Sequence, residues 1–147
     1  MVQKNGRKDR YAEYPSRVLV RIHCPEVREY GLQLWETGDQ NGPLLILANY
    51  TAADREMLED LLYSADNRLR QWSMWQFIYL MEKNTPGLPE IDTYDLLMMA
   101  EDLLVSRSTL VKALLACGRV DDELAEELLF DVYREVRELA ENYFAVK

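Results

Sequence analysis

The sequence predicts an α+β fold, in which an N-terminal three-stranded antiparallel sheet is followed by a bundle of four to five helices. Apolar and polar residues alternate before residue 50, as they do in half-buried strands, and helical spacing with capping residues follows. Eight of the ten residues from Trp72 to Met81 are apolar or aromatic, and they point in nearly every direction of a helix. Such a helix must be enclosed by other elements, which places it at the centre of the core.

The predicted sheet covers residues 16–50. Its three strands are expected at residues 18–23, 30–36 and 44–50. Residues 37–43 contain two glycines and a proline, a composition typical of a turn before the third strand. A helix from Pro25 to Trp35 is the competing interpretation of this region.

Helices are expected from residue 51 to residue 145. Thr51 has the position of an N-cap, and Asp54 favours the positive end of the helix that follows it. The apolar face of this helix continues into the stretch 72–81, so one uninterrupted helix is expected, with a break near residues 64–67 as the alternative. After a breaker at residues 84–89, further helices are expected from Asp92 or Thr93 to Leu104, from Ser106 to Gly118, and from Asp121 to about Phe144.

The length of 147 residues fits one domain, expected at residues 15–147 after a flexible basic arm at residues 1–14. The formal net charge is −9, and residues 120–147 alone contribute −6. An acidic surface repels nucleic acid and favours basic protein surfaces. The central apolar stretch is about half of the roughly 20 residues that a membrane span needs, so no membrane segment is expected.

No arrangement of residues indicates an enzyme, a cofactor or a metal site. His23 is the only histidine, which excludes a histidine-based metal cluster. Cys24 and Cys117 lie far apart, without the spacing of a zinc site. No glycine-rich phosphate-binding motif occurs. The N-terminus lacks the apolar segment of a secretory signal, so the expected location is the cytoplasm.

The last expected helix carries the first candidate site. Its apolar residues form a broad inward face, and acidic residues lie opposite that face. Phe130 projects into the acidic arc, and aromatic residues often supply much of the energy of an interface. The candidate partner-binding residues are Glu123, Glu127, Phe130, Asp131 and Glu138. A singly exposed phenylalanine is the alternative interpretation of the same pattern.

A second candidate lies at about residues 96–117. Ala100 stands where two helices would cross, and Leu103 and Val105 stand where they would be buried. This segment resembles the helix-turn-helix of bacterial and phage regulators, although Leu104 stands where the turn usually has glycine. The resemblance implies DNA binding, with Arg107, Ser108, Thr109 and Lys112 facing the major groove. A helix pair in a small bundle is the alternative.

These features predict a small acidic, non-catalytic binding protein that occupies a basic surface of a protein partner. If that partner normally holds nucleic acid, the acidic helices would mimic phosphates, as inhibitors carried by phages and mobile elements do. The alternative is a helix-turn-helix transcriptional regulator whose basic arm adds phosphate contacts, and nucleic acid is a partner only in that case. An enzyme of unfamiliar type is a third hypothesis. A homodimer would complete the burial of the central helix.

Overall fold

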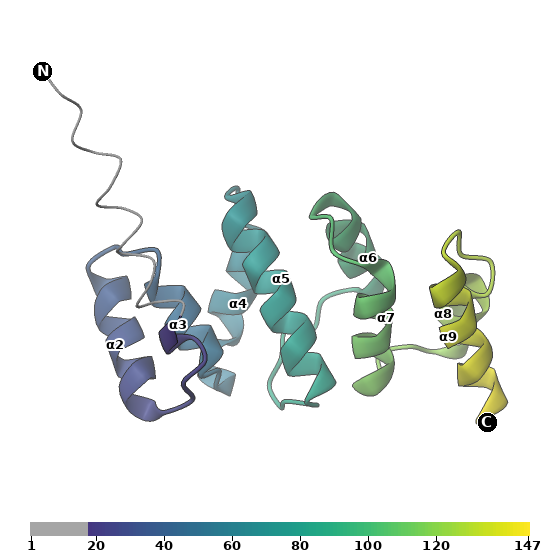
Figure 1. The fold of residues 1–147 in the computed structure, drawn as a ribbon, viewed down its shortest axis with the longest axis horizontal. Helices are drawn as coiled ribbons and strands as arrows, with labels where there is room; N and C mark the ends of the chain where they lie inside the picture. Colours follow the sequence, from purple (N-terminus) through teal and green to yellow (C-terminus); the bar gives the residue numbers. More distant parts are fainter. Residues whose placement is uncertain (1–17) are drawn as a thin grey trace, which may run out of the picture. The chain divides into compact units, whose positions relative to one another are not determined.

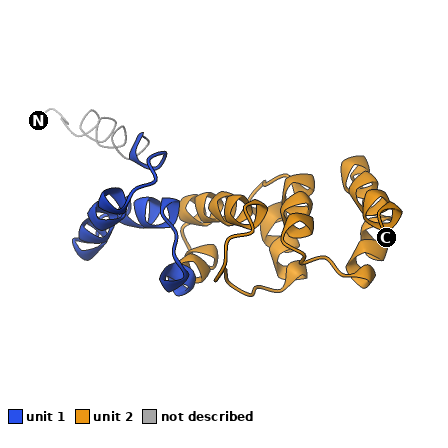
Figure 2. Cartoon of the chain, turned by 90° about the horizontal axis from the view of Figure 1, so that it is seen from below, with its two compact units in different colours: residues 1–57 blue, residues 58–147 orange. Residues whose placement is uncertain are grey.

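The computed structural model describes residues 18–147, and these residues form helices and their connections, with no strand (Figure 1). The chain divides into two compact units, residues 1–57 and residues 58–147 (Figure 2). The expected basic arm, residues 1–14, lies outside the described residues. Within the described range no helix is long and apolar enough to cross a membrane.

The predicted three-stranded sheet is wrong, because helices replace its last two strands. These helices are α2 (Pro25–Glu36) and α3 (Gly42–Ala48). The competing interpretation, a helix from Pro25 to Trp35, agrees with α2. A proline in the first turn suits a helix as well as it suits the start of a strand, and both helices begin in this way. Residues 18–22 form backbone hydrogen bonds between residues three apart, as a helical turn does.

Helices α2 and α3 approach each other so closely that their backbones touch. A Cβ atom built on Gly42 would lie 2.6 Å from the backbone nitrogen of Trp35, and one on Gly31 would lie 2.9 Å from Cβ of Leu45. Only glycine fits at two such positions. Three consecutive residues of α3, Leu45, Ile46 and Leu47, are fully buried.

The predicted cap at Thr51 is confirmed. Thr51 precedes the short 3₁₀ helix η1 (Ala52–Asp54), which leads into α4 (Arg55–Leu62). The Asp54 carboxylate accepts hydrogen bonds from the backbone N–H of Thr51 at 2.8 Å and from its hydroxyl at 3.2 Å. The same carboxylate, 6% exposed, pairs with Arg28 of α2 at 2.5 Å. This ion pair joins the segment after α3 to α2.

The second unit contains α5 (Asn67–Glu82), α6 (Thr93–Asp102), α7 (Arg107–Ala116), α8 (Asp122–Leu128) and α9 (Arg134–Ala145). Helix α7 is its centre, since α5 packs against one side of α7 and α9 packs against another (Figure 1). Helix α6 pairs with α7, and α8 pairs with α9. The alternative break near residues 64–67 is observed: Asp66 caps α5 by accepting hydrogen bonds from the N–H groups of Arg68 and Leu69.

The central stretch is less enclosed than expected. Met74, Phe77 and Met81 of α5 are fully buried, and Ile78 and Leu80 are buried as well. Trp75 and Tyr79, however, are 44% and 37% exposed. Helix α5 therefore has one outward face, and Trp75 does not lie at the centre of the core.

The single helix expected from Asp121 to Phe144 is also interrupted. Asp121 caps α8 by accepting a hydrogen bond from the N–H of Leu124 at 2.8 Å. The chain then leaves the helix at residues 129–133 and resumes as α9. This interruption creates the candidate site.

Candidate partner-binding site

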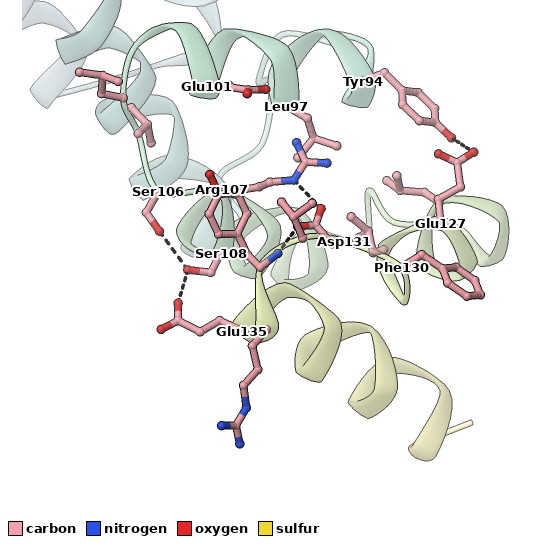
Figure 3. Close-up of a pocket in the computed structure, with 17 residues that line it drawn as sticks. Tyr94, Leu97, Glu101, Ser106, Arg107, Ser108, Glu127, Phe130, Asp131 and Glu135 are labelled. Atoms are coloured by element: carbon pink, nitrogen blue, oxygen red, sulfur yellow. Dashed lines mark hydrogen bonds and ion pairs between the residues drawn. The ribbon is translucent and has the colours of Figure 1, made fainter.

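A hollow of about 1160 Å³ lies in the second unit, between the α6–α7 pair and the α8–α9 pair (Figure 3). Two connections between helices contribute to its walls, residues 103–106 and residues 129–133. The remaining walls come from α6, the first turn of α7, α8 and the first turn of α9.

Three unusually exposed apolar side chains line this hollow. Leu104 is 89% exposed, Phe130 is 87% exposed and Val132 is 84% exposed. In the described part of the chain, only one other large apolar side chain is exposed to this degree, Val146 at 86%. Scattered exposed apolar residues are ordinary, but a concentration of them around one concavity is typical of an interaction surface.

Leu104 also has a strained backbone. It ends α6 with a φ of +56°, the left-handed region that favours glycine. The N–H of Val105 donates to the carbonyl of Ala100 at 2.8 Å, which closes the helix end. Gly118 fills the same position at the end of α7, with a φ of +71°. A leucine in this conformation costs about 1–2 kcal/mol, and strain of this kind is often kept at functional positions.

Two arginine side chains donate hydrogen bonds to the 129–133 connection. Arg107 of α7 donates to the Asp131 carboxylate at 2.6 Å, and that side chain is only 5% exposed. Arg137 of α9 donates to the backbone carbonyls of Asp131 at 2.7 Å and Val132 at 3.1 Å. Because Asp131 is turned inward, its neighbours Phe130 and Val132 are left facing solvent (Figure 3 shows Phe130 pointing away from the helices).

Further polar contacts join the two helix pairs across the hollow (Figure 3). The Ser108 hydroxyl donates to Glu135 of α9 at 2.9 Å and also bonds the Ser106 hydroxyl at 2.9 Å. Tyr94 of α6 donates its hydroxyl to Glu127 of α8 at 3.0 Å. This hydrogen bond is the main reason that the pKa of Tyr94 is raised above its usual value.

The sequence-predicted residues of both candidate sites meet here in part. From the acidic set, Glu127, Phe130 and Asp131 line the hollow, whereas Glu123 and Glu138 lie outside its lining. From the helix-turn-helix set, Arg107 and Ser108 line it. Thr109 is half-buried and Lys112 is exposed on α7, both outside the lining. Arg107 and Ser108 donate to Asp131 and Glu135, so both side chains are engaged with the segment from α8 to α9.

Sequence reasoning did not select several of the lining residues, namely Tyr94, Glu101, Leu104, Val132, Tyr133 and Glu135. Leu104 could have been selected from the sequence, because it replaces the glycine expected in its turn. Val132 and Tyr133 could not, because the expected continuous helix hid the connection to which they belong.

The only histidine and the serine that meets a carboxylate belong to different units. His23 lies in the first unit, where its Nδ1 atom is 2.8 Å from the Ala48 carbonyl, as in a structural contact. The Ser108 hydroxyl in the second unit donates to a carboxylate, and the sequence of that unit contains no histidine that could act as its base. Among residues 18–147, no three histidine, cysteine or acidic side chains are grouped closely enough to hold a metal ion.

No protein-family model matches this chain, and no curated protein or solved structure matches it either.

Proposed function

We propose that this chain is a non-catalytic binding protein that engages a partner protein through the hollow between the α6–α7 and α8–α9 pairs. The observation that carries the proposal is the placement of Leu104, Phe130 and Val132, three of the most exposed apolar side chains described, around one concavity. Full burial of such a side chain releases about 1.5–3 kcal/mol. A partner that covers all three would gain about 4.5–9 kcal/mol, a substantial part of the cost of association.

The support beneath these side chains favours the same function. Arg107 and Arg137 fix the backbone of the 129–133 connection, and the closed end of α6 fixes Leu104. A surface already held in its binding conformation loses little conformational entropy on association. A chain that needed only solubility would have no use for apolar side chains held outward in this way.

The finer form of the proposal is an inhibitor whose acidic helices mimic nucleic acid, acting in the cytosol. Residues 120–147 contain nine carboxylates and three cations, a charge density that suits a basic partner surface. Asp131 and Glu138 contribute less to this surface than expected, since each already pairs with an arginine. The mimicry would therefore rest mainly on the exposed carboxylates of α8 and on Glu141 of α9.

The test is a selection of random peptides on the full-length protein, with counter-selection on the triple variant Leu104→Ser, Phe130→Ser and Val132→Ser. We expect enriched peptides to bind the natural protein and to lose about a hundredfold in affinity for the variant, a loss of about 3 kcal/mol. A matched control replaces Tyr63, Met98 and Val146 by serine, because these side chains are also exposed but lie outside the hollow. Equal binding to both triple variants would contradict the proposal.

A DNA-binding regulator is the second candidate, favoured by one observation. The α6–α7 pair has a four-residue connection with a left-handed residue inside it, at the position where the helix-turn-helix turn usually carries glycine. Two features oppose it: α7 is packed between α5 and α9, and Arg107 is bound to Asp131. A duplex-DNA gel shift at low and at physiological salt tests it. Binding that weakens steeply with salt and disappears in Lys112→Ala would favour the regulator.

A further inference from the structure

The charges around the hollow are not balanced. Arg107 and Arg134 are the cations that line it, and each is already paired, Arg107 with Asp131 and Arg134 with Glu138 at 2.7 Å. Three lining carboxylates have no cation partner among residues 18–147, and they belong to Glu101, Glu127 and Glu135. The hollow therefore offers three uncompensated negative charges.

These carboxylates come from three helices around the apolar side chains. Glu101 is exposed near the end of α6, beside the connection that carries Leu104. Glu127 lies on α8, and Glu135 lies in the first turn of α9, on either side of the connection that carries Phe130 and Val132. The hydrogen bonds that Glu127 and Glu135 accept come from neutral hydroxyl groups, which leave their charge in place.

We propose that the occupant of the hollow is a cationic amphipathic segment of a partner protein. Its apolar residues would cover Leu104, Phe130 and Val132, and its lysines or arginines would pair with Glu101, Glu127 and Glu135. The charge pattern disfavours an anionic segment, because the three carboxylates without a cation partner would repel it. This inference rests on the proposed function and adds to it the chemistry of the partner.

The experiment measures the binding of three fluorescent peptide probes to the full-length protein: a leucine–lysine peptide of helical period, a leucine–glutamate peptide of the same pattern, and oligolysine. The leucine–lysine probe alone combines apolar side chains with cations. We expect it to bind at least about tenfold more tightly than either of the others, and its affinity should fall as salt screens the charges.

Two charge variants separate the hollow from the general acidity of the chain. The first replaces Glu101, Glu127 and Glu135 by glutamine, which keeps the hydrogen bonds from Tyr94 and Ser108. The control replaces Glu56, Glu82 and Glu90 by glutamine, three exposed residues outside the lining and outside α8 and α9. Both variants lose the same net charge. We expect about a tenfold loss of leucine–lysine binding in the first and less than about twofold in the control.

The outcomes distinguish this inference from the proposed function. Equal losses in the two charge variants, or equal binding of the leucine–lysine and leucine–glutamate probes, would overturn the cationic partner. The proposed function would survive that result if the Leu104, Phe130 and Val132 serine variant still abolished binding. If neither the apolar nor the charge substitutions changed the binding of any probe, both proposals would fail. Circular dichroism of each variant confirms that it is folded.

Discussion

Leu104 stands at a position that glycine fills at the end of α7, and the comparison between the two helix ends gives a direct prediction. Leu104 has a φ of +56° and is 89% exposed, so its side chain contributes little to the core. Leu104→Gly should remove the left-handed strain and raise the free energy of unfolding by up to about 1 kcal/mol. The same substitution should weaken partner binding, because it deletes one of the three apolar anchors.

Chemical denaturation measures this effect, and Gly118→Ala is the matched control. Gly118 has a φ of +71° with open space around its Cβ position, so alanine there should lower the free energy of unfolding by about 1 kcal/mol. A destabilised Leu104→Gly would mean that the leucine side chain stabilises the fold by contacts that its exposure does not reveal.

Ser73 provides a second prediction at the scale of one side chain. Its hydroxyl is fully buried in α5 and has no hydrogen-bond partner in the described structure. Burying an unpaired hydroxyl is unfavourable, so Ser73→Ala should leave the thermal midpoint unchanged or raise it. Ser108 is the contrasting case, since its hydroxyl bonds both Glu135 and Ser106. Ser108→Ala should therefore lower the midpoint, and the reverse order of the two variants would contradict the assignment of these contacts.

At the scale of helix pairs, the α2–α3 contact predicts a steric cost. Gly42→Ala would place a Cβ atom 2.6 Å from a backbone nitrogen of α2, which cannot move without shifting the helix. We expect a loss of about 1–3 kcal/mol in the free energy of unfolding, measured by denaturant titration. Gln33→Ala, on the exposed side of α2, serves as the control and should stay within about 0.5 kcal/mol. Equal effects would mean that the helices are further apart than described.

The connection between α8 and α9 predicts unequal roles for two arginines. Arg107 pairs with a carboxylate that is 5% exposed, whereas Arg134 pairs with one that is 51% exposed. Arg107→Ala leaves Asp131 buried without its cation, which should cost about 2–4 kcal/mol. Arg134→Ala should cost about 0.5 kcal/mol or less. The thermal unfolding midpoints of the two variants measure this difference in stability. Similar midpoints would argue against the inward position of Asp131.

Most of the elements after residue 50 were predictable because their signals are local. Helices η1, α5 and α6 each begin after a polar N-cap residue, namely Thr51, Asp66 and Asp92. Gly118 ends a helix as expected. The sheet was mispredicted because a short apolar run such as residues 44–50 suits a buried helix as well as a buried strand. Of the two glycines that let α2 and α3 touch, Gly42 was interpreted as a turn residue and Gly31 as part of a strand.

The candidate site was only partly predictable because its contacts span long distances in sequence. Arg107 and Asp131 were both selected, but for opposite functions, since periodicity cannot show that residues 24 apart form an ion pair. The interruption at residues 129–133 contains no glycine or proline. The contacts of Asp131 with Arg107 and Arg137 supply a reason for it, and they exist only in the folded protein.

For the whole molecule, the carboxylates make stability depend on pH. Asp122 of α8 accepts hydrogen bonds from Lys147 and from Tyr143, the latter at 2.8 Å. These bonds, with that from Lys147 contributing most, lower the pKa of Asp122 below its ordinary value of 3.8. A group whose pKa is depressed in the folded state adds stability above its unfolded pKa, and this contribution is lost as the pH falls through its folded pKa.

We therefore expect the natural protein to lose stability below about pH 4 more steeply than Asp122→Asn does. Urea midpoints measured from neutral pH to about pH 3 show this difference. Glu141→Gln is the control, because Glu141 is exposed on α9 and should leave the acid dependence nearly unchanged. Parallel curves for the natural protein and Asp122→Asn would mean that Lys147 and Tyr143 do not hold this carboxylate in solution.

The 129–133 connection separates what the fold requires from what a binding surface can vary. The fold holds this segment through the Asp131 side chain and through two backbone carbonyls, and it makes little use of the side chains at positions 130 and 132. Substitutions at these two positions can therefore change partner preference at little cost in stability. The connection is accordingly a natural place for specificity to diverge, and a suitable site for grafting a new recognition sequence.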